Sequence, residues 1–269
     1  MEYVITIVFG LVIGSFLNVC IYRIPQGGSI TKPSRSYCPH CNHTLSAWDN
    51  IPVFSYLFLR GKCRYCKGKI SPRYIIVELL TACIFALILY RTLNLYKTNS
   101  DIALNLLRGC IFAGFLIVIS FIDFQFMDIY NIVVYPGLAV GFLFTLFETI
   151  LKRDKSIIIS NVLGAVAGAV IILLIAILGT YAFKKEAMGM GDVSLMAMIG
   201  MFVGLWPNII LTLILGAFIG SVVGIILMIL KRKKSDSQIP FGPFLSIGGL
   251  ITMLYGKEIW AWYHHLMGL

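Results

Sequence analysis

Charged residues are scarce in this chain. They make up 13% of its 269 residues, and aspartate and glutamate together number only 12. A soluble globular domain usually carries about 25% charged residues. Hydrophobic residues instead reach 59%, with a mean hydropathy of +0.89. This balance excludes an ordinary soluble domain and predicts an all-α protein that crosses the membrane several times.

Three further absences exclude particular kinds of protein or segment. The apolar stretch from Val4 to Ile21 has no basic segment before it and no small-residue cleavage pattern after it, so we expect a retained first span rather than a signal peptide. No basic stripe with interleaved aromatic residues stands apart from the apolar segments, which argues against nucleic-acid binding. No internal repeat or low-complexity tract is recognisable.

Positive charge is unevenly distributed along the chain. The formal net charge is +10, and Lys and Arg gather in residues 23–73, at Lys184-Lys185 and in residues 231–234. Cytoplasmic loops carry such an excess, so we place these segments on the cytoplasmic side, where they also favour contact with the lipid bilayer. The exceptions to this assignment are Lys152, Arg153 and Lys155.

Long apolar segments predict about eight spans. We expect them at residues 3–21, 74–92, 104–122, 129–150, 157–183, 193–206, 208–230 and 241–265. The chain then divides into a first span (1–21), a cytoplasmic domain (22–73) and a transmembrane domain (74–269). The sixth segment is short and contains Gly200 and Gly204, so it could be a broken or re-entrant element.

Two Cys-x-x-Cys pairs, Cys38 with Cys41 and Cys63 with Cys66, lie in the predicted cytoplasmic domain. Two such pairs can present four thiolates to one tetrahedral Zn²⁺ ion, and the cytoplasm disfavours disulfides. A segment of this size without a long apolar run also needs a metal ion or a cross-link to stabilise its fold. We therefore predict a small zinc-ribbon-like domain with a structural zinc. A redox pair or unligated cysteines are the alternatives.

Two aspartates border long apolar segments, where a carboxylate is costly and suggests a function. Asp123 ends the third predicted span, and Asp192 follows Gly189 and Gly191 and opens the sixth. If both ends meet at the cytoplasmic surface, one carboxyl can hold a proton while the other activates water, as in aspartic proteases. The glycines would permit a tight turn and the close approach of a substrate backbone.

Other acidic residues have plainer interpretations. Asp128 and Asp154 are typical of interfacial or helix-capping positions. Glu78 lies one turn into the second predicted span, where it could support the site, pair with Arg73 or relay protons. Its role stays open at the level of sequence.

Taken together, these motifs resemble those of the bacterial type IV prepilin peptidases, which are membrane aspartyl proteases of the Gly-x-Gly-Asp type. The resemblance rests on both cysteine pairs, on Ile122-Asp123 and on Gly189-Met190-Gly191-Asp192. Further matching segments are Gly14-Ser15-Phe16-Leu17-Asn18-Val19, Tyr22-Arg23-Ile24-Pro25, Ile51-Pro52, Arg60-Gly61-Lys62-Cys63, Ile70-Ser71-Pro72-Arg73-Tyr74, Val77-Glu78-Leu79 and Ile239-Pro240-Phe241-Gly242-Pro243-Phe244. Their shared order and spacing make the resemblance specific.

The resemblance implies two activities. The first is cleavage of the leader peptide of type IV prepilins or pseudopilins at the cytoplasmic face of the bacterial inner membrane, with Asp123 and Asp192 as the catalytic pair. The second is N-methylation of the new amino terminus with S-adenosylmethionine, associated with Gly61 and Lys62. Residues 74–269 would then form the aspartyl peptidase domain, and type IV pili, protein secretion or competence would be the setting.

At one position the chain departs from the family pattern, because Asn131 stands where a third acid is common. This departure predicts that a third acid is not needed for hydrolysis. From the residues alone, two other functions stay open: a proton-coupled transporter with a zinc-ribbon domain, and a non-enzymatic scaffold of a pilus or secretion machine. A transporter would predict inverted repeats and acids near mid-span. A scaffold would leave the glycine-flanked Asp192 unexplained.

Overall fold

The structure is a computed structural model of the chain, and it describes residues 1–184, 188–230 and 239–267. These residues are all-helical, with two isolated β-bridges and no β-strand among them. They form two compact units, Met1–Val118 and Ile119–Leu269. The basic residues Lys185 and 231–234, predicted to be cytoplasmic, lie outside the described residues.

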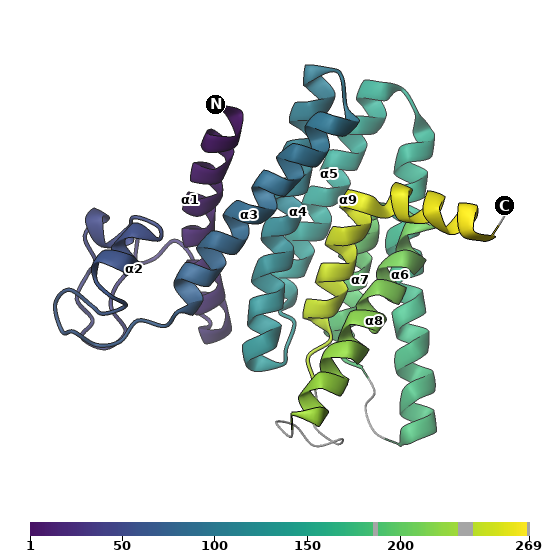
Figure 1. Cartoon of the computed structure of the whole chain (residues 1–269). Helices are drawn as coiled ribbons and strands as arrows, with labels where there is room; N and C mark the ends of the chain where they lie inside the picture. The colour runs from purple at the N-terminus through teal and green to yellow at the C-terminus, as the bar shows by residue number, and fades with distance from the viewer. Residues whose placement is uncertain (185–187, 231–238, 268–269) are drawn as a thin grey trace. The chain divides into compact units, whose positions relative to one another are not determined.

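The first unit is built on α1 (Glu2–Arg23) and α3 (Arg73–Leu95), which pack side by side (Figure 1). Small residues allow the two backbones to approach, since a Cβ added to Gly10 or Gly14 would lie 2.7 Å from an α3 Cα atom. Helix α4 (Asn99–Phe126) begins in this unit and ends in the second.

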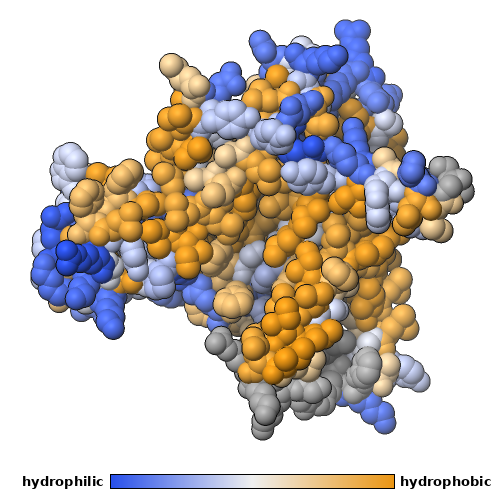
Figure 2. Space-filling view, viewed as in Figure 1, coloured by the Kyte–Doolittle hydropathy of each residue, from blue (hydrophilic) through white to orange (hydrophobic). Residues whose placement is uncertain are grey.

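The chain between α1 and α3 contains only short elements. They are η1 (Ile24–Gln26), η2 (Ala47–Asn50) and α2 (Phe54–Phe58). Arg23 fixes the start of this segment, because its guanidinium donates to the backbone carbonyls of Ser29, Ile30, Pro33 and Arg35. Figure 2 shows hydrophilic side chains gathered over this segment, at the left of the view.

The second unit packs its helices around a short central one. Its helices are α5 (Asn131–Lys152), α6 (Lys155–Phe183), α7 (Met190–Val203), α8 (Asn208–Ile229) and α9 (Gly242–Met267), besides the end of α4. Helix α7 contacts α5, α6, α8 and α9 and is buried along most of its length. It runs without interruption through Gly200 and ends before Gly204, so the broken element considered from the sequence is absent within residues 190–203.

Glycines explain how α6 and α7 come together. Gly164 and Gly200 meet backbone to backbone, and a Cβ added to Gly168 would lie 2.8 Å from the Met196 carbonyl oxygen. Helices α8 and α9 also pack against each other, with Gly216 facing Leu245. These small residues therefore serve helix packing.

Six helices are long and apolar enough to cross a membrane: α1, α3, α4, α5, α6 and α8. Their outward surfaces are apolar, as Figure 2 shows for α8, whose Phe218 and Ile229 are 65% and 72% exposed. An apolar surface of this kind suits contact with lipid. The all-helical, multi-pass prediction is confirmed to this extent. Each predicted span corresponds to a helix, but α7 and α9 fall outside the six, so the count of eight stays a prediction.

Candidate active site and cysteine cluster

Asp123 and Asp192 are buried at helix ends of the second unit. Asp123 lies in the last turn of α4 and is 5% exposed, and Asp192 lies in the first turn of α7 and is 9% exposed. The N–H of Gly242, which begins α9, donates to Asp123 Oδ2 at 2.9 Å. The N–H of Gly189 donates to Asp192 Oδ2 at 3.3 Å. Each carboxylate is therefore oriented by a backbone donor.

Ile129 brings these two carboxylates into one cluster. A Cβ added to Gly191, next to Asp192, would lie 2.6 Å from Ile129 Cβ. A Cβ added to Gly242 would lie 3.0 Å from Ile129 Cδ1 and 2.6 Å from Asp123 Oδ2. The backbones beside both acids thus pack on the same side chain. We call these residues, Asp123, Ile129, Gly191, Asp192 and Gly242, the aspartate cluster.

One oxygen of the aspartate cluster has a hydrogen-bonding capacity that the protein does not use. Asp192 Oδ1 is buried, and within the described ranges no donor reaches it. Buried polar atoms nearly always have a partner, so this oxygen is suited to accept a hydrogen bond from a water molecule or a substrate. The arrangement has what general base catalysis needs: a held carboxylate with one free acceptor.

The structure changes the interpretation of the glycines beside Asp192. Gly191 packs against Ile129, which leaves no room for a Cβ there, and the approach of a substrate to these glycines stays a prediction. Gly189 contributes its N–H, and a Cβ there would have room, with its nearest contact at 3.7 Å. Sequence reasoning missed Ile129 and the role of Gly242. The only available signal was the resemblance of the segment around Gly242 to a family signature.

The remaining polar residues fall near their predicted places. Asp154 caps α6 by accepting the Ser156 N–H at 2.9 Å, which confirms its capping role. Asp128 is exposed just beyond α4. Asn131 is exposed at the first position of α5.

In the first unit, the four predicted metal ligands come together. The Sγ atoms of Cys38, Cys41, Cys63 and Cys66 all lie within 4.8 Å of one another, and those of Cys38 and Cys66 are 3.9 Å apart. Zn–S bonds of about 2.3 Å in a tetrahedron place sulfur atoms about 3.8 Å apart. The cluster therefore has the ligand number, ligand type and spacing of a site that could hold a metal ion.

Each cysteine pair lies in its own turn, and the two turns have the same hydrogen-bond pattern. The Cys38 N–H donates to the His43 carbonyl at 3.0 Å, and the Cys63 N–H donates to the Gly68 carbonyl at 2.8 Å. The residue after each second cysteine, Asn42 or Lys67, is left-handed, with φ of 54° or 60°. Backbone N–H groups of Cys66 and Tyr65 lower the pKa of the Cys63 thiol to about 7, whereas burial and the neighbouring thiols of Cys66 and Cys38 outweigh the His43 N–H and raise the pKa of Cys41 to about 11.

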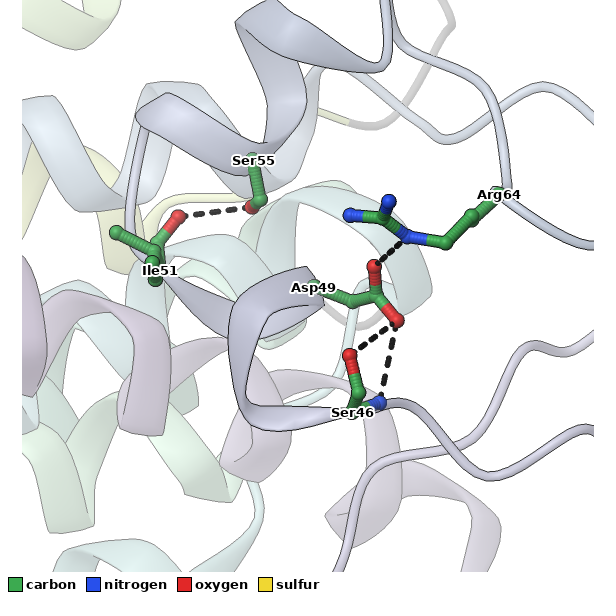
Figure 3. Close-up of polar contacts among 5 residues, drawn as sticks. All are labelled: Ser46, Asp49, Ile51, Ser55 and Arg64. Carbon is green, nitrogen blue, oxygen red and sulfur yellow. Dashed lines mark hydrogen bonds and ion pairs between the residues drawn. The ribbon is translucent and has the colours of Figure 1, made fainter.

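An ion pair joins the linker between the cysteine pairs to the second pair (Figure 3). Arg64 donates to Asp49 Oδ1 at 2.6 Å, and Asp49 Oδ2 accepts from both the N–H and the hydroxyl of Ser46. Burial alone would raise the pKa of Asp49, but the hydrogen bonds from Arg64 and Ser46 hold it below its usual value. These contacts tie η2 to the turn that carries Cys63 and Cys66.

Gly61 and Lys62 lie at the start of the second cysteine turn. Gly61 is left-handed, with φ of 66°, and a Cβ there would lie 3.0 Å from the Tyr56 hydroxyl. Lys62 forms the isolated bridge with Lys69. Glu78, whose role the sequence left open, is buried in α3 and accepts the Val53 N–H at 2.7 Å. It anchors the segment between the cysteine pairs to α3.

Comparisons with known proteins match nearly the whole chain. Residues 8–92 match the bacterial peptidase A24 N-terminal domain, and residues 110–225 match the type IV leader peptidase family. Proteins named prepilin leader peptidase/N-methyltransferase from Aeromonas hydrophila and Pseudomonas putida are each 34% identical to it. The alignments cover 95% of this chain and 91% of the Aeromonas protein, and 99% of this chain and 96% of the Pseudomonas protein. No solved structure matches.

Proposed function

Because the chain belongs to the type IV leader peptidase family, we propose that it removes the leader peptide of type IV prepilins or pseudopilins and N-methylates the new amino terminus. The relatives' name states both activities. The observation that carries the first is the aspartate cluster, in which two buried carboxylates share the packing around Ile129. Neither a transporter nor a scaffold accounts for this pair together with the family match.

In the proposed hydrolysis, Asp123 and Asp192 act as a pair that shares one proton. The ionised carboxylate takes a proton from a water molecule, whose oxygen attacks the scissile carbonyl carbon. The protonated carboxyl stabilises the developing oxyanion and then gives a proton to the leaving amine as the C–N bond breaks. Gly242 and Gly189 hold one oxygen of each acid, which leaves Asp192 Oδ1 for the water.

The proposed setting is the bacterial inner membrane, with the catalytic face in the cytoplasm. The basic residues of segment 23–73 favour this orientation by the positive-inside rule. In this proposal the eight helices α1 and α3 to α9 cross or enter the bilayer. Residues 1–21 form a first span, 22–73 a cytoplasmic domain, and 74–269 the peptidase domain. Lipid and the prepilin or pseudopilin are its partners.

We assign a structural zinc ion to the cysteine cluster. Four thiolates at tetrahedral spacing would complete the coordination of zinc and leave no open position for a substrate. Zinc binding would contribute directly to the folding of a segment that has only short helices and two isolated bridges. Its loss should therefore act through stability rather than through chemistry.

The proposed second activity uses S-adenosylmethionine, which supplies a methyl group carried on positively charged sulfur. The chain's task is to bind this donor, exclude water and receive the proton that leaves the terminal ammonium. The family resemblance associates Gly61 and Lys62 with this step. Gly61 acts indirectly in our proposal, because its close neighbour is the ring of Tyr56.

Mass spectrometry of a co-expressed prepilin tests both activities at once. We expect a product that has lost its leader and gained the mass of one methyl group in place of one hydrogen atom. A prepilin that keeps its leader in the presence of folded, membrane-inserted protein would contradict the proposed peptidase. A shortened but unmethylated product would contradict the methyltransferase alone.

A further inference from the structure

Residues 257–267, the last turns of α9, have an apolar face and a polar face. Within each set the residues recur at intervals of one, three and four positions, so each set lies on one side of the helix. The apolar face consists of Ile259, Trp260, Trp262, Tyr263, Leu266 and Met267, and the polar face consists of Lys257, Glu258, Ala261, His264 and His265. We call residues 257–267 the amphipathic segment. Helix α8, which packs against α9, contains no charged residue and has no such division.

The protein itself leaves most of the apolar face uncovered. Trp262 and Leu266 are 64% and 65% exposed, and Tyr263 and Met267 are exposed as well. Large apolar side chains gathered on one exposed face mark a surface that another molecule or a membrane covers. Lys257 on the polar face is also exposed. A helix with both faces exposed suits the boundary between an apolar and an aqueous medium.

Contacts with α8 place the amphipathic segment near a membrane surface. A Cβ added to Gly256 would lie 3.2 Å from the Oδ1 atom of Asn208, which is the first residue of α8. Because α8 is long and apolar enough to cross a membrane, its first residue belongs near one of the two surfaces. The amphipathic segment therefore begins at that level. In Figure 1 the last turns of α9 then run sideways from the direction of its first turns.

Aromatic contacts hold the amphipathic segment to the start of α8. The Trp260 ring meets the edge of the Trp206 ring, with centroids 5.7 Å apart, and Trp206 lies in the connection between α7 and α8. Trp260 also stacks on Tyr263 at 5.2 Å and packs edge-on against His264 at 5.0 Å. With Trp262, three of the four tryptophans of the chain gather here. Tryptophan and tyrosine are enriched at the headgroup level of membranes, because one end of each ring system is apolar and the other is polar.

We propose that the amphipathic segment lies along the membrane surface, at the boundary between the phospholipid headgroups and the acyl chains. In this arrangement Trp262 and Leu266 insert between lipid chains, and Lys257 extends to the headgroups and water. The span predicted at residues 241–265 then ends near Gly256. Helix α9 is held at both ends, since its first residue, Gly242, donates to Asp123 in the aspartate cluster.

Phospholipid accounts for the apolar face better than a second copy of the chain does. The face continues through Trp260 to Trp206, which is 64% exposed and directly precedes a helix with an outward apolar surface. Lipid that covers the outer side of α8 therefore also reaches the amphipathic segment. The segment also ends in two histidines beside its apolar face, and polar side chains of this kind are suited to the headgroup layer.

The test measures how deeply one tryptophan of the amphipathic segment lies in the bilayer. The full-length chain with Trp48→Phe, Trp206→Phe and Trp260→Phe keeps Trp262 as its only tryptophan. It is placed, one copy per nanodisc, in phosphatidylcholine that carries bromine either near the headgroups or near the ends of the acyl chains. We expect bromine near the headgroups to quench Trp262 emission by about half or more, since interfacial helices bury their apolar face only about 5–10 Å deep. Deep bromine and iodide in the water should quench it less.

The matched control moves the reporter by one position, to the polar face. Adding Ala261→Trp and Trp262→Phe to the same chain makes residue 261, which is exposed, the only tryptophan position. Iodide should now quench more strongly than either brominated lipid. If the substituted chains fold poorly, the unchanged chain gives the same comparison, because three of its four tryptophans lie at this end.

Each result decides for or against the membrane-surface position. Stronger quenching by shallow than by deep bromine, reversed in favour of iodide at position 261, supports the proposal. Quenching of Trp262 that is strongest with deep bromine overturns it, because α9 would then continue into the bilayer. Quenching of Trp262 by iodide alone also overturns it, and protection from iodide that appears only with two copies per nanodisc would assign the apolar face to a second copy instead. No prepilin or methyl donor enters the measurement, so its outcome is independent of the proposed function.

Discussion

The cysteine cluster and the aspartate cluster differ in how the sequence builds them. The four cysteines lie in one short stretch, in which Cys38 and Cys66 are 28 positions apart, and each pair forms the same turn. The aspartate cluster joins residues as far apart as Asp123 and Gly242, 119 positions along the chain. The first site depends on local turns, and the second depends on how helices α4, α7 and α9 pack. The two sites should therefore fail in different ways.

The largest expected effect is on cleavage, from Asp123→Asn or Asp192→Asn. An amide cannot share or accept the proton, so each change should reduce prepilin cleavage by about 10²- to 10⁴-fold. Zinc content and donor binding should not change, because they belong to the other site. A membrane cleavage assay with metal analysis checks both. Asp128→Asn, at an exposed position, is the matched control and should retain activity. Near-normal cleavage by either site variant would rule out the pair.

A smaller loss should follow from crowding the aspartate cluster without replacing its acids. An added Cβ in Gly191→Ala meets Ile129 at 2.6 Å, and in Gly242→Ala it meets Asp123 at 2.6 Å. Overpacking costs about 1–3 kcal/mol, so we expect cleavage to fall by about ten- to a hundredfold. Gly189→Ala has room for its Cβ and should stay within about threefold of the unchanged chain. Equal losses at Gly189 and Gly191 would show that the Ile129 contact is not what matters.

This contrast explains which features the sequence could predict. The cysteine ligands were predictable because Cys-x-x-Cys spacing acts within one turn. The helices were predictable from apolar length, as at residues 3–21, which became Glu2–Arg23. Ile129 was assigned to a span for the same reason, because hydropathy does not distinguish an apolar residue in a helix from one buried in a loop. In the structure α5 begins at Asn131, and Ile129 packs between Gly191 and Gly242.

The start of α7 shows the same limit. Its apolar run begins at Val193, but the helix begins at Met190, because the Asp192 carboxylate accepts the Gly189 N–H within the first turn. A cap of this kind extends a helix into polar residues that hydropathy excludes. The contact of Gly242 with Asp123 joins two segments with no shared pattern. No single sequence motif could therefore have predicted this contact.

Loss of the metal from the cysteine cluster should reduce both activities, and each by a smaller factor than the aspartate substitutions reduce cleavage. Cys38→Ser combined with Cys41→Ser, or a strong chelator, should remove zinc and expose residues 24–72 to protease. A structural zinc can contribute about 10 kcal/mol or more to folding. Both activities should fall partially, by about two- to tenfold, while the aspartate cluster keeps its residues. Limited proteolysis with metal analysis measures the effect. Cys83→Ser, at an exposed position in α3, is the control. Reduced protein that contains no zinc when freshly purified would contradict the assignment.

The smallest effect on cleavage should come from Gly61→Val, which separates the two activities. The new side chain would meet the Tyr56 ring at about 3 Å and displace it within the segment that we associate with methyl transfer, so methylation should fall about tenfold or more. Cleavage should stay within about twofold, because the aspartate cluster is built from other residues. Gly27→Val is the matched control: its φ is 68°, close to the 66° of Gly61, and no atom lies within 4 Å of its added Cβ. This variant carries the same backbone strain without displacing a neighbouring side chain. Leader removal and the N-terminal mass are measured in one sample. If Gly27→Val reduces methylation as much as Gly61→Val does, backbone strain is the cause and Tyr56 is not.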